Sequence, residues 1–338
     1  MSALKSVFKE SFLPQQQSPQ VHFSRTLLIC FSLLIAWSAV FMKPGWLELF
    51  AEHIVIAVMM VVGSFVAGST PLGGGAVAFP VMTKLLSTPP ESSMHFSLMI
   101  QSIGMTSASI LILLSRHQLP WRGIALYLVG SFSGFYLVTQ YLYATLSSAE
   151  VKVMFSLNIA IFLLVYLFGY YADKFNERQI QVCRRKMITL VTFGCLGGGM
   201  SAFIGSGADL FAFALFTIYF RLNIVQATQA SVIIMATTSI FGLITFFFQG
   251  TQPAEVIFEY WYVAAPVVIF GAPIGAWVCC KVSKKVIHHM IIALSSLELA
   301  STLLLLPLGE RSALIFCFQL LVMFALFSWN KKQMRTSG

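Results

Sequence analysis

Long apolar runs recur along the whole chain, and they constrain its fold more than any other feature of the sequence. A run of about 18 or more residues with few charges is long enough to cross the hydrocarbon core of a bilayer as one helix. Only 10% of the 338 residues are charged, whereas a soluble domain carries about 25% charge. The sequence therefore predicts an all-α polytopic membrane protein.

Eight apolar segments are predicted to cross the membrane, at roughly 26–42, 92–114, 123–142, 151–171, 224–248, 260–280, 286–306 and 312–329. Two further segments, 53–86 and 187–220, are each about 34 residues long and contain glycines in their middle. A straight helix of that length would measure about 50 Å, against a hydrocarbon core of about 30 Å. Each of these two segments must therefore break.

Loop charges indicate how the chain crosses the membrane. The 172–187 loop holds five Lys and Arg residues, whereas the 249–260 loop holds Glu255 and Glu259 and no basic residue. Because basic loops stay on the cytoplasmic side, this pattern predicts a protein of the cell inner membrane with both termini in the cytoplasm.

This orientation requires the segments 53–86 and 187–220 each to return to the side from which it started. We therefore predict two helical hairpins that enter the membrane from opposite faces. Their second arms, at about 76–86 and 209–220, would be long enough for only half a bilayer, which favours re-entrant hairpins. Loop charge alone leaves open whether each arm crosses half or all of the membrane.

The two broken segments superpose when the chain is shifted by 132 positions. "STPLGGGAVAF" at 69–79 then lies on "SAFIGSGADLF" at 201–211, with five identities. Three crossings follow each hairpin, and because three is odd the second repeat is predicted to be inverted. Inverted repeats with matched glycine-interrupted segments are typical of secondary transporters. Chance matching of apolar sequence is the alternative.

This repeat defines the predicted organisation of the chain. The parts are a cytoplasmic tail at 1–25, an extra helix and loop at 26–52, repeat 1 at 53–171, a basic linker at 172–186, repeat 2 at 187–329 and a second tail at 330–338.

The glycine segments resemble those of the TauE/SafE family of membrane proteins. The similarity rests on "GGGAVAFPVM" and "GSGADLFAFALF", each followed by a polar helix with small residues, "HFSLMIQSIGMTSAS" and "ATQASVIIMATTS". This resemblance implies export of sulfite or of a small organosulfonate. The second copy departs from the first, because Asp209 stands where the first copy has Val77.

Glycines that break a helix inside a membrane must line a buried or watered cavity, because free backbone groups cannot face lipid. The short helix that follows each turn would present its N–H groups and positive dipole end to an anion. The predicted substrate-binding residues are the turn glycines with nearby hydroxyl and amide side chains: Ser69, Thr70, Gly73, Gly74, Gly75, Gln101, Thr106, Ser107, Gly205, Ser206, Gly207, Gln229, Thr237, Thr238 and Ser239. The alternative for the hydroxyl residues is close helix packing.

Few charged residues are candidates for membrane depth, and three of them bear on function. Asp209 is the candidate for coupling anion movement to a proton, with compensation of a helix N-terminus as the alternative. Lys84 would either extend to the outer interface or attract anions there. Glu298 would either be a functional ionisable residue inside the membrane or form a hydrogen bond to a neighbouring helix.

The leading hypothesis is a secondary transporter for a small sulfur-containing anion, and a passive channel for anions or small solutes is the alternative. No P-loop, HExxH motif or converging catalytic set is present, so we expect neither an enzyme nor an ATPase. The cysteines have no metal-like spacing, and no cofactor or metal is expected. The expected partners are the anion, the lipid bilayer and protons, with no role for nucleic acid; the sequence gives no oligomeric state.

Overall fold

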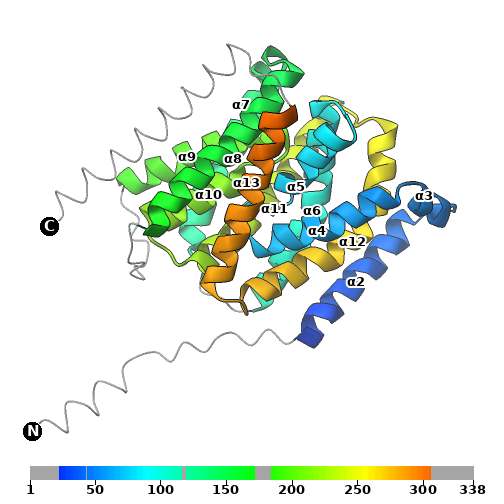
Figure 1. The fold of residues 1–338 in the computed structure, drawn as a ribbon, viewed down its shortest axis with the longest axis horizontal. Coiled ribbons are helices and arrows are strands. Elements are labelled where there is room, and N and C mark those ends of the chain that lie inside the picture. The colour runs from blue at the N-terminus through cyan, green and yellow to red at the C-terminus, as the bar shows by residue number, and fades with distance from the viewer. Residues whose placement is uncertain (1–22, 43, 116–118, 172–183, 306–338) are drawn as a thin grey trace, which may run out of the picture.

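The computed structural model describes residues 23–42, 44–115, 119–171 and 184–305 (Figure 1). All regular elements within these residues are helical, which confirms the predicted all-α class. The expected span at 312–329 and both tails lie outside the described residues, as does most of the basic linker.

Twelve α-helices form the described part of the chain. They are α2 (Phe23–Phe41), α3 (Trp46–Glu52), α4 (Ile54–Ser69), α5 (Gly75–Pro80), α6 (Pro90–Leu114), α7 (Trp121–Tyr141), α8 (Ser148–Tyr171), α9 (Arg184–Ile204), α10 (Ala208–Ala214), α11 (Ile224–Gln249), α12 (Glu255–Cys279) and α13 (Lys284–Leu305). Five-residue π-helices, η1 (Val81–Leu85) and η3 (Leu215–Tyr219), extend α5 and α10, and η2 (Tyr143–Thr145) is a 3₁₀ turn.

Six of the described helices are long and apolar enough to cross a membrane: α2, α6, α7, α9, α11 and α12. Helices α3 and α4 are bent by 80° relative to each other, and together they would make a seventh span if the bent pair is taken as a single span. Helices α8 and α13 form where spans were expected but are not among the six. The chain is therefore a multi-pass protein, while the count of eight spans stays a prediction.

Both long apolar segments break at their glycines, as expected. The first breaks between α4 and α5, and the second between α9 and α10. Gly73 has φ of 69°, and Gly205 and Gly207 have φ of 73° and 142°, values that side chains other than glycine rarely adopt. The short arms that follow, at 75–85 and 208–219, begin and end within one residue of the predicted second arms. How deep each arm reaches into a bilayer stays a prediction.

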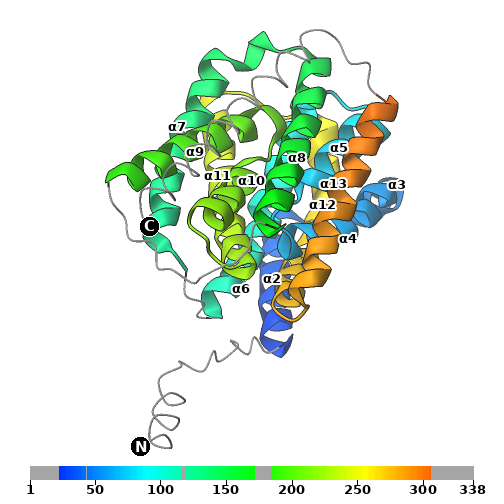
Figure 2. The same ribbon diagram turned by 60° about the vertical axis from the view of Figure 1, so that its left-hand side comes forward.

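The same order of elements occurs twice. A long helix, a short helix, a π-helix and three more helices run from α4 to α8 and again from α9 to α13. The two halves are interleaved, because α7 packs along α9 and α12 packs along α4 (Figure 1, Figure 2).

Glycines allow these two helix pairs to approach backbone to backbone. A Cβ added at Gly134 of α7 would collide with the carbonyl of Cys195 in α9, and one at Gly275 of α12 would collide with the carbonyl of Phe65 in α4. Small residues at such crossings are typical of membrane helices. The interleaving brings the two glycine turns toward the same region of the molecule.

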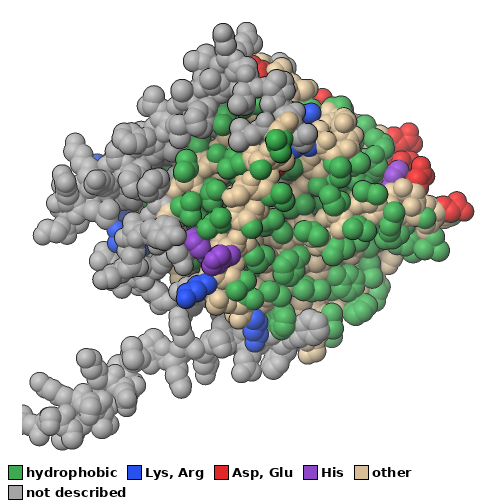
Figure 3. All heavy atoms as spheres, viewed as in Figure 1, with side chains coloured by type: hydrophobic (Ala, Val, Ile, Leu, Met, Phe, Trp, Pro, Cys, Tyr) green, Lys and Arg blue, Asp and Glu red, His purple; other side chains and the backbone are tan. Residues whose placement is uncertain are grey.

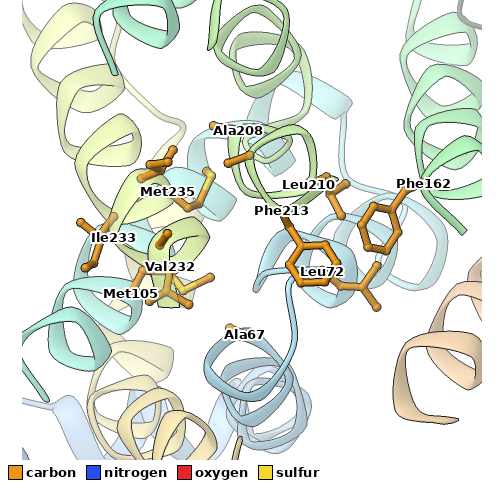
Figure 4. Close-up of a cluster of buried hydrophobic side chains, with 14 of the residues drawn as sticks. Ala67, Leu72, Met105, Phe162, Ala208, Leu210, Phe213, Val232, Ile233 and Met235 are labelled. Carbon is orange, nitrogen blue, oxygen red and sulfur yellow. The ribbon is translucent and has the colours of Figure 1, made fainter. Parts of the chain in front are cut away.

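Hydrophobic side chains cover much of the face seen in Figure 3, while acidic side chains gather at one edge near α3. Exposed apolar residues on α2 and α4 include Leu28, at 67%, and Val58, at 58%. Such a surface fits a lipid environment. Inside, one buried cluster contains Leu72 beside the first turn, Phe213 in the second arm and Phe162 of α8 (Figure 4).

Candidate functional site

The two glycine turns meet in the interior of the protein. A Cβ added at Gly73 would collide with the carboxylate of Asp209, and one at Gly75 would collide with the side chain of Ser206. The backbone of the first turn therefore touches side chains of the second at a distance that only glycine permits. We call this contact the turn junction; it comprises residues 73–75 and 205–209.

Helix α6 holds the second turn in place. Gln101 donates from Nε2 to the carbonyl oxygen of Gly205 (2.6 Å) and to Oγ of Ser97 (2.9 Å). Ser97 also donates to the carbonyl of Gly205, at 3.2 Å. Because α6 belongs to the first half of the chain, these bonds tie the two halves together at the turn junction.

The start of α10 is capped by the protein's own side chains. Oδ1 of Asp209 accepts hydrogen bonds from the N–H groups of Gly207 (3.1 Å) and Leu210 (3.0 Å). Oγ of Ser201 accepts from the N–H of Ala208, at 3.0 Å. The start of α5 differs, because its N-cap residue Gly74 has no side-chain acceptor. The two turns are thus chemically unequal: the N–H groups of the second turn already bind the carboxylate of Asp209, whereas the first turn has no side-chain cap.

Several polar atoms at the turn junction and on the α6 face that contacts it are buried without a hydrogen-bond partner. They include Oδ2 of Asp209, Oγ of Ser206 and Oε1 of Gln101. These residues are 1%, 0% and 1% exposed. An unsatisfied buried polar group costs about 1–3 kcal/mol, and each such group calls for an explanation. Three of them around one contact favour a place where a polar ligand binds.

A small cavity lies beside the turn junction. Its volume is about 10 Å³, and it is lined by Gly74, by Gln101 and Gly104 of α6, and by Val268 and Ala272 of α12, among others. That volume is about the space for one water molecule. An anion with several heavy atoms needs more room than this cavity offers.

Seven of the fifteen predicted binding residues lie together at the turn junction or on the α6 face that contacts it: Gly73, Gly74, Gly75, Gln101, Gly205, Ser206 and Gly207. Ser69 and Thr70 lie just before the first turn and donate back to carbonyls of α4.

The remaining predicted residues serve other contacts or lie elsewhere. Ser107 and Thr237 donate to carbonyls of their own helices, and Thr238 bonds to Oγ of Ser131 in α7, at 2.9 Å. Thr106 and Ser239 each have a buried hydroxyl without a partner.

Gln229 donates to Sγ of Cys280, at 3.5 Å. Cys280 directly follows α12 and is eight residues, or about 12 Å of helix, from Ala272. Gln229 is therefore not brought to the cavity.

Three residues of the site were not expected from the sequence. Ser97 lies one helical turn before Gln101, and Ser201 is the repeat partner of Ser69, so spacing and repetition could have identified both. Tyr127 of α7 donates from its hydroxyl to the carbonyl of Ala208, at 2.9 Å, and no sequence signal points to it.

A family model described as sulfite exporter TauE/SafE matches residues 55–302. The chain belongs to the TauE/SafE family. The match covers both broken segments and the whole turn junction, and it begins in α4 and ends in α13, so α2 lies outside it. TauE/SafE proteins are membrane transporters, which is compatible with a function other than catalysis. No curated protein and no solved structure matches this sequence.

Proposed function

We propose that this chain is a secondary transporter that exports sulfite or a C2 organosulfonate, and that the anion binds at the turn junction. The observation that carries the proposal is the contact of the two turns, with Gly73 against Asp209 and Gly75 against Ser206, next to a small cavity. Membership of the TauE/SafE family supports the class of substrate.

Neutral donors would hold the anion. In the described part of the chain, no Lys or Arg is among the nearest neighbours of the turn glycines. The hydroxyl of Ser206 has no hydrogen-bond partner and is free to donate to an oxyanion. The first turn consists of glycines, so its backbone can approach an oxyanion directly. Asp209 occupies the corresponding N–H groups of the second turn.

Asp209 is the proposed coupling residue. An ionised carboxylate next to a substrate anion in a low-dielectric interior would repel it strongly. Protonation at Oδ2 removes this repulsion and creates an O–H donor that faces the first turn. Binding of the anion and of a proton would thus favour each other, which is the condition for coupled transport.

We further propose that residues 53–171 and 187–329 are inverted repeats that move against each other around the turn junction. The duplicated order of elements and the interleaved pairs α7 with α9 and α4 with α12 support this arrangement. Rocking of one repeat against the other is a common route to alternating access. The proposed location is the cell inner membrane, with both termini cytoplasmic.

The test is a binding screen of the purified protein by thermal shift against sulfite, thiosulfate and C2 sulfonates. Sulfite or a sulfonate should raise the melting temperature, because a ligand that binds only the folded state stabilises it. Gly74→Ala should abolish the shift, since its Cβ would lie 3.4 Å from Ala67 Cβ and Gln101 Cγ and so fill the cavity without a clash. Gly199→Ala is the matched control, because its Cβ would meet Val138 and Gly134 of α7 and no residue of the turn junction. Absence of a shift with every sulfur anion would overturn the proposal.

A further inference from the structure

A tyrosine fills the space beside the second turn. The hydroxyl of Tyr127 in α7 donates to the carbonyl of Ala208, at 2.9 Å, and the whole side chain is buried. A Cβ added at Gly197 of α9 would collide with that hydroxyl, so the absence of a side chain there makes room for the tyrosine. Tyr127 therefore reaches past α9 and occupies the space between α9 and the start of α10.

Val268 of α12 has the position in the second half of the chain that Tyr127 has in the first. Gly134 of α7 approaches the backbone of α9, and Gly275 of α12 approaches the backbone of α4 in the same way. Tyr127 lies seven residues, about two helical turns, before Gly134, and Val268 lies seven residues before Gly275. The two side chains therefore have the same register relative to the helix crossings.

The small cavity lies on the side of the first turn where α12 carries this valine. Val268 lines the cavity together with Ala67 of α4 (Figure 4) and Gly74 of the first turn, among others. Ala67 has the position in α4 that Gly197 has in α9, two residues after the backbone contact of the crossing. The cavity therefore corresponds to the space that Tyr127 fills in the other half, and the shorter valine leaves it open.

The lining of this cavity is mostly apolar. Ser64 and Gln101 are the only lining residues with polar side chains, and the Ser64 hydroxyl donates to the carbonyl of Met60, at 2.6 Å. Nε2 of Gln101 donates to the carbonyl of Gly205, which leaves Oε1 as a side-chain acceptor without a partner. Because a buried water needs two to four polar partners, an apolar group of similar size fits this cavity better than water does.

An organosulfonate has such an apolar group and sulfite does not. Every organosulfonate has a carbon atom bonded to sulfur, whereas sulfite consists of sulfur and oxygen alone. The cavity, at about 10 Å³, has the space for one group of about the size of a water molecule, such as a methyl or methylene group. Gly74 belongs to both the turn junction and the cavity lining, so a ligand with its oxyanion head at the first turn can place its carbon in the cavity.

We propose that Val268 determines which sulfur anions the site accepts, because it leaves room beside the first turn for the first carbon group of an organosulfonate. This inference rests on the proposed function, since the head of the same anion binds at the turn junction. Beside the second turn, Tyr127 already occupies the corresponding space. The site thus takes one short-chain sulfonate with its head at the turns and its tail toward α12.

The test measures the affinity of the purified protein for sulfite, methanesulfonate, ethanesulfonate and propanesulfonate by isothermal titration. Val268→Ala removes two carbon atoms from the cavity wall. It should tighten the binding of propanesulfonate by about fourfold for each further CH₂ group that becomes buried. The affinity for sulfite, which has no tail, should stay within about twofold of the wild-type value. The measured quantity is therefore the ratio of the propanesulfonate and sulfite affinities.

Val263→Ala is the matched control, because Val263 is a fully buried valine of the same helix that does not line the cavity. It loses the same two carbon atoms and should keep the wild-type ratio. If Val268→Ala also keeps the wild-type ratio, the inference is wrong.

A second variant covers the case in which Val268→Ala does not fold. Val268→Ile adds one carbon atom, which is about what the cavity holds, and it should weaken the binding of all three alkanesulfonates relative to sulfite. An unchanged ratio in Val268→Ile would overturn the inference. A wild-type protein that binds sulfite but no alkanesulfonate would overturn it as well and leave the proposed function standing. If the wild type binds none of these anions, the proposed function itself fails.

Discussion

Asp209 makes the two turns unequal at the scale of single residues. One carboxylate oxygen completes the hydrogen bonds at the start of α10, and the other faces the first turn without a partner. A single side chain can therefore stabilise the second turn and control the charge at the turn junction. Val77, at the matching position of the first segment, lies instead next to Gly63 of α4.

Asp209→Asn separates these two roles. The amide oxygen can still accept from Gly207 and Leu210, so the variant should fold with a melting temperature close to that of wild type. It cannot take up a proton, so anion flux in proteoliposomes should no longer respond to a pH gradient. Flux that responds as in wild type would exclude Asp209 as the coupling residue. Flux that ignores the gradient in wild type as well would be the behaviour of a passive channel.

Gly75 and Gly74 should differ sharply in their tolerance of a methyl group. Gly75→Ala places a Cβ against Ser206 and should force the turns apart, at a cost of about 1–3 kcal/mol as for other overpacked sites. Gly74→Ala makes only ordinary contacts and should leave stability unchanged. The melting temperatures of the two purified variants compare these costs, and equal values would contradict the close approach of the turns.

At the scale of elements, the short arms and the interleaved helix pairs determine where the turns lie. Each arm ends in a five-residue π-helix, a form that is rare and often found at functional sites. The long helices beside the arms cross at glycines, so that α7 contacts α9 and α12 contacts α4 through their backbones. Movement of one pair would shift the turn that it supports.

Two adjacent glycines of α9 test this packing. A Cβ at Gly198 would collide with the carbonyl of Ser131 in α7, whereas one at Gly199 would lie 3.0 Å from a methyl group of Val138. Both substitutions raise helix propensity by about 1 kcal/mol, so that term cancels between them. Gly198→Ala should therefore lower the melting temperature relative to Gly199→Ala. The opposite order would mean that α7 and α9 do not pack as described.

The sequence was sufficient to predict the breaks and the short arms, because glycine content and helix length act locally. It placed the arms within one residue of their observed limits. It could not predict that Gly73 contacts Asp209, or that Lys84 pairs with Glu298, because those contacts join residues more than 130 positions apart. Gln229 was predicted as a binding residue from its amide alone, and the sequence could not predict that this amide lies next to Sγ of Cys280.

At the scale of the whole molecule, charge determines the proposed orientation. Gln252, just before α12, and Lys281, just after it, are both exposed. If α12 crosses the membrane, a cysteine at Gln252 should react with an impermeant maleimide in intact cells, and one at Lys281 should not, in a background without the native cysteines. Reaction at both positions, or only at Lys281, would contradict the orientation with cytoplasmic termini.

The most direct test of the central claim is export of labelled sulfite from preloaded proteoliposomes. The account predicts export by the wild-type protein and by Gly199→Ala, and its loss in Gly74→Ala, although all three should have similar melting temperatures. Loss in Gly74→Ala alone would place the anion path at the turn junction. Equal export by Gly74→Ala and wild type would show that the anion does not pass between the two glycine turns, and would contradict the account.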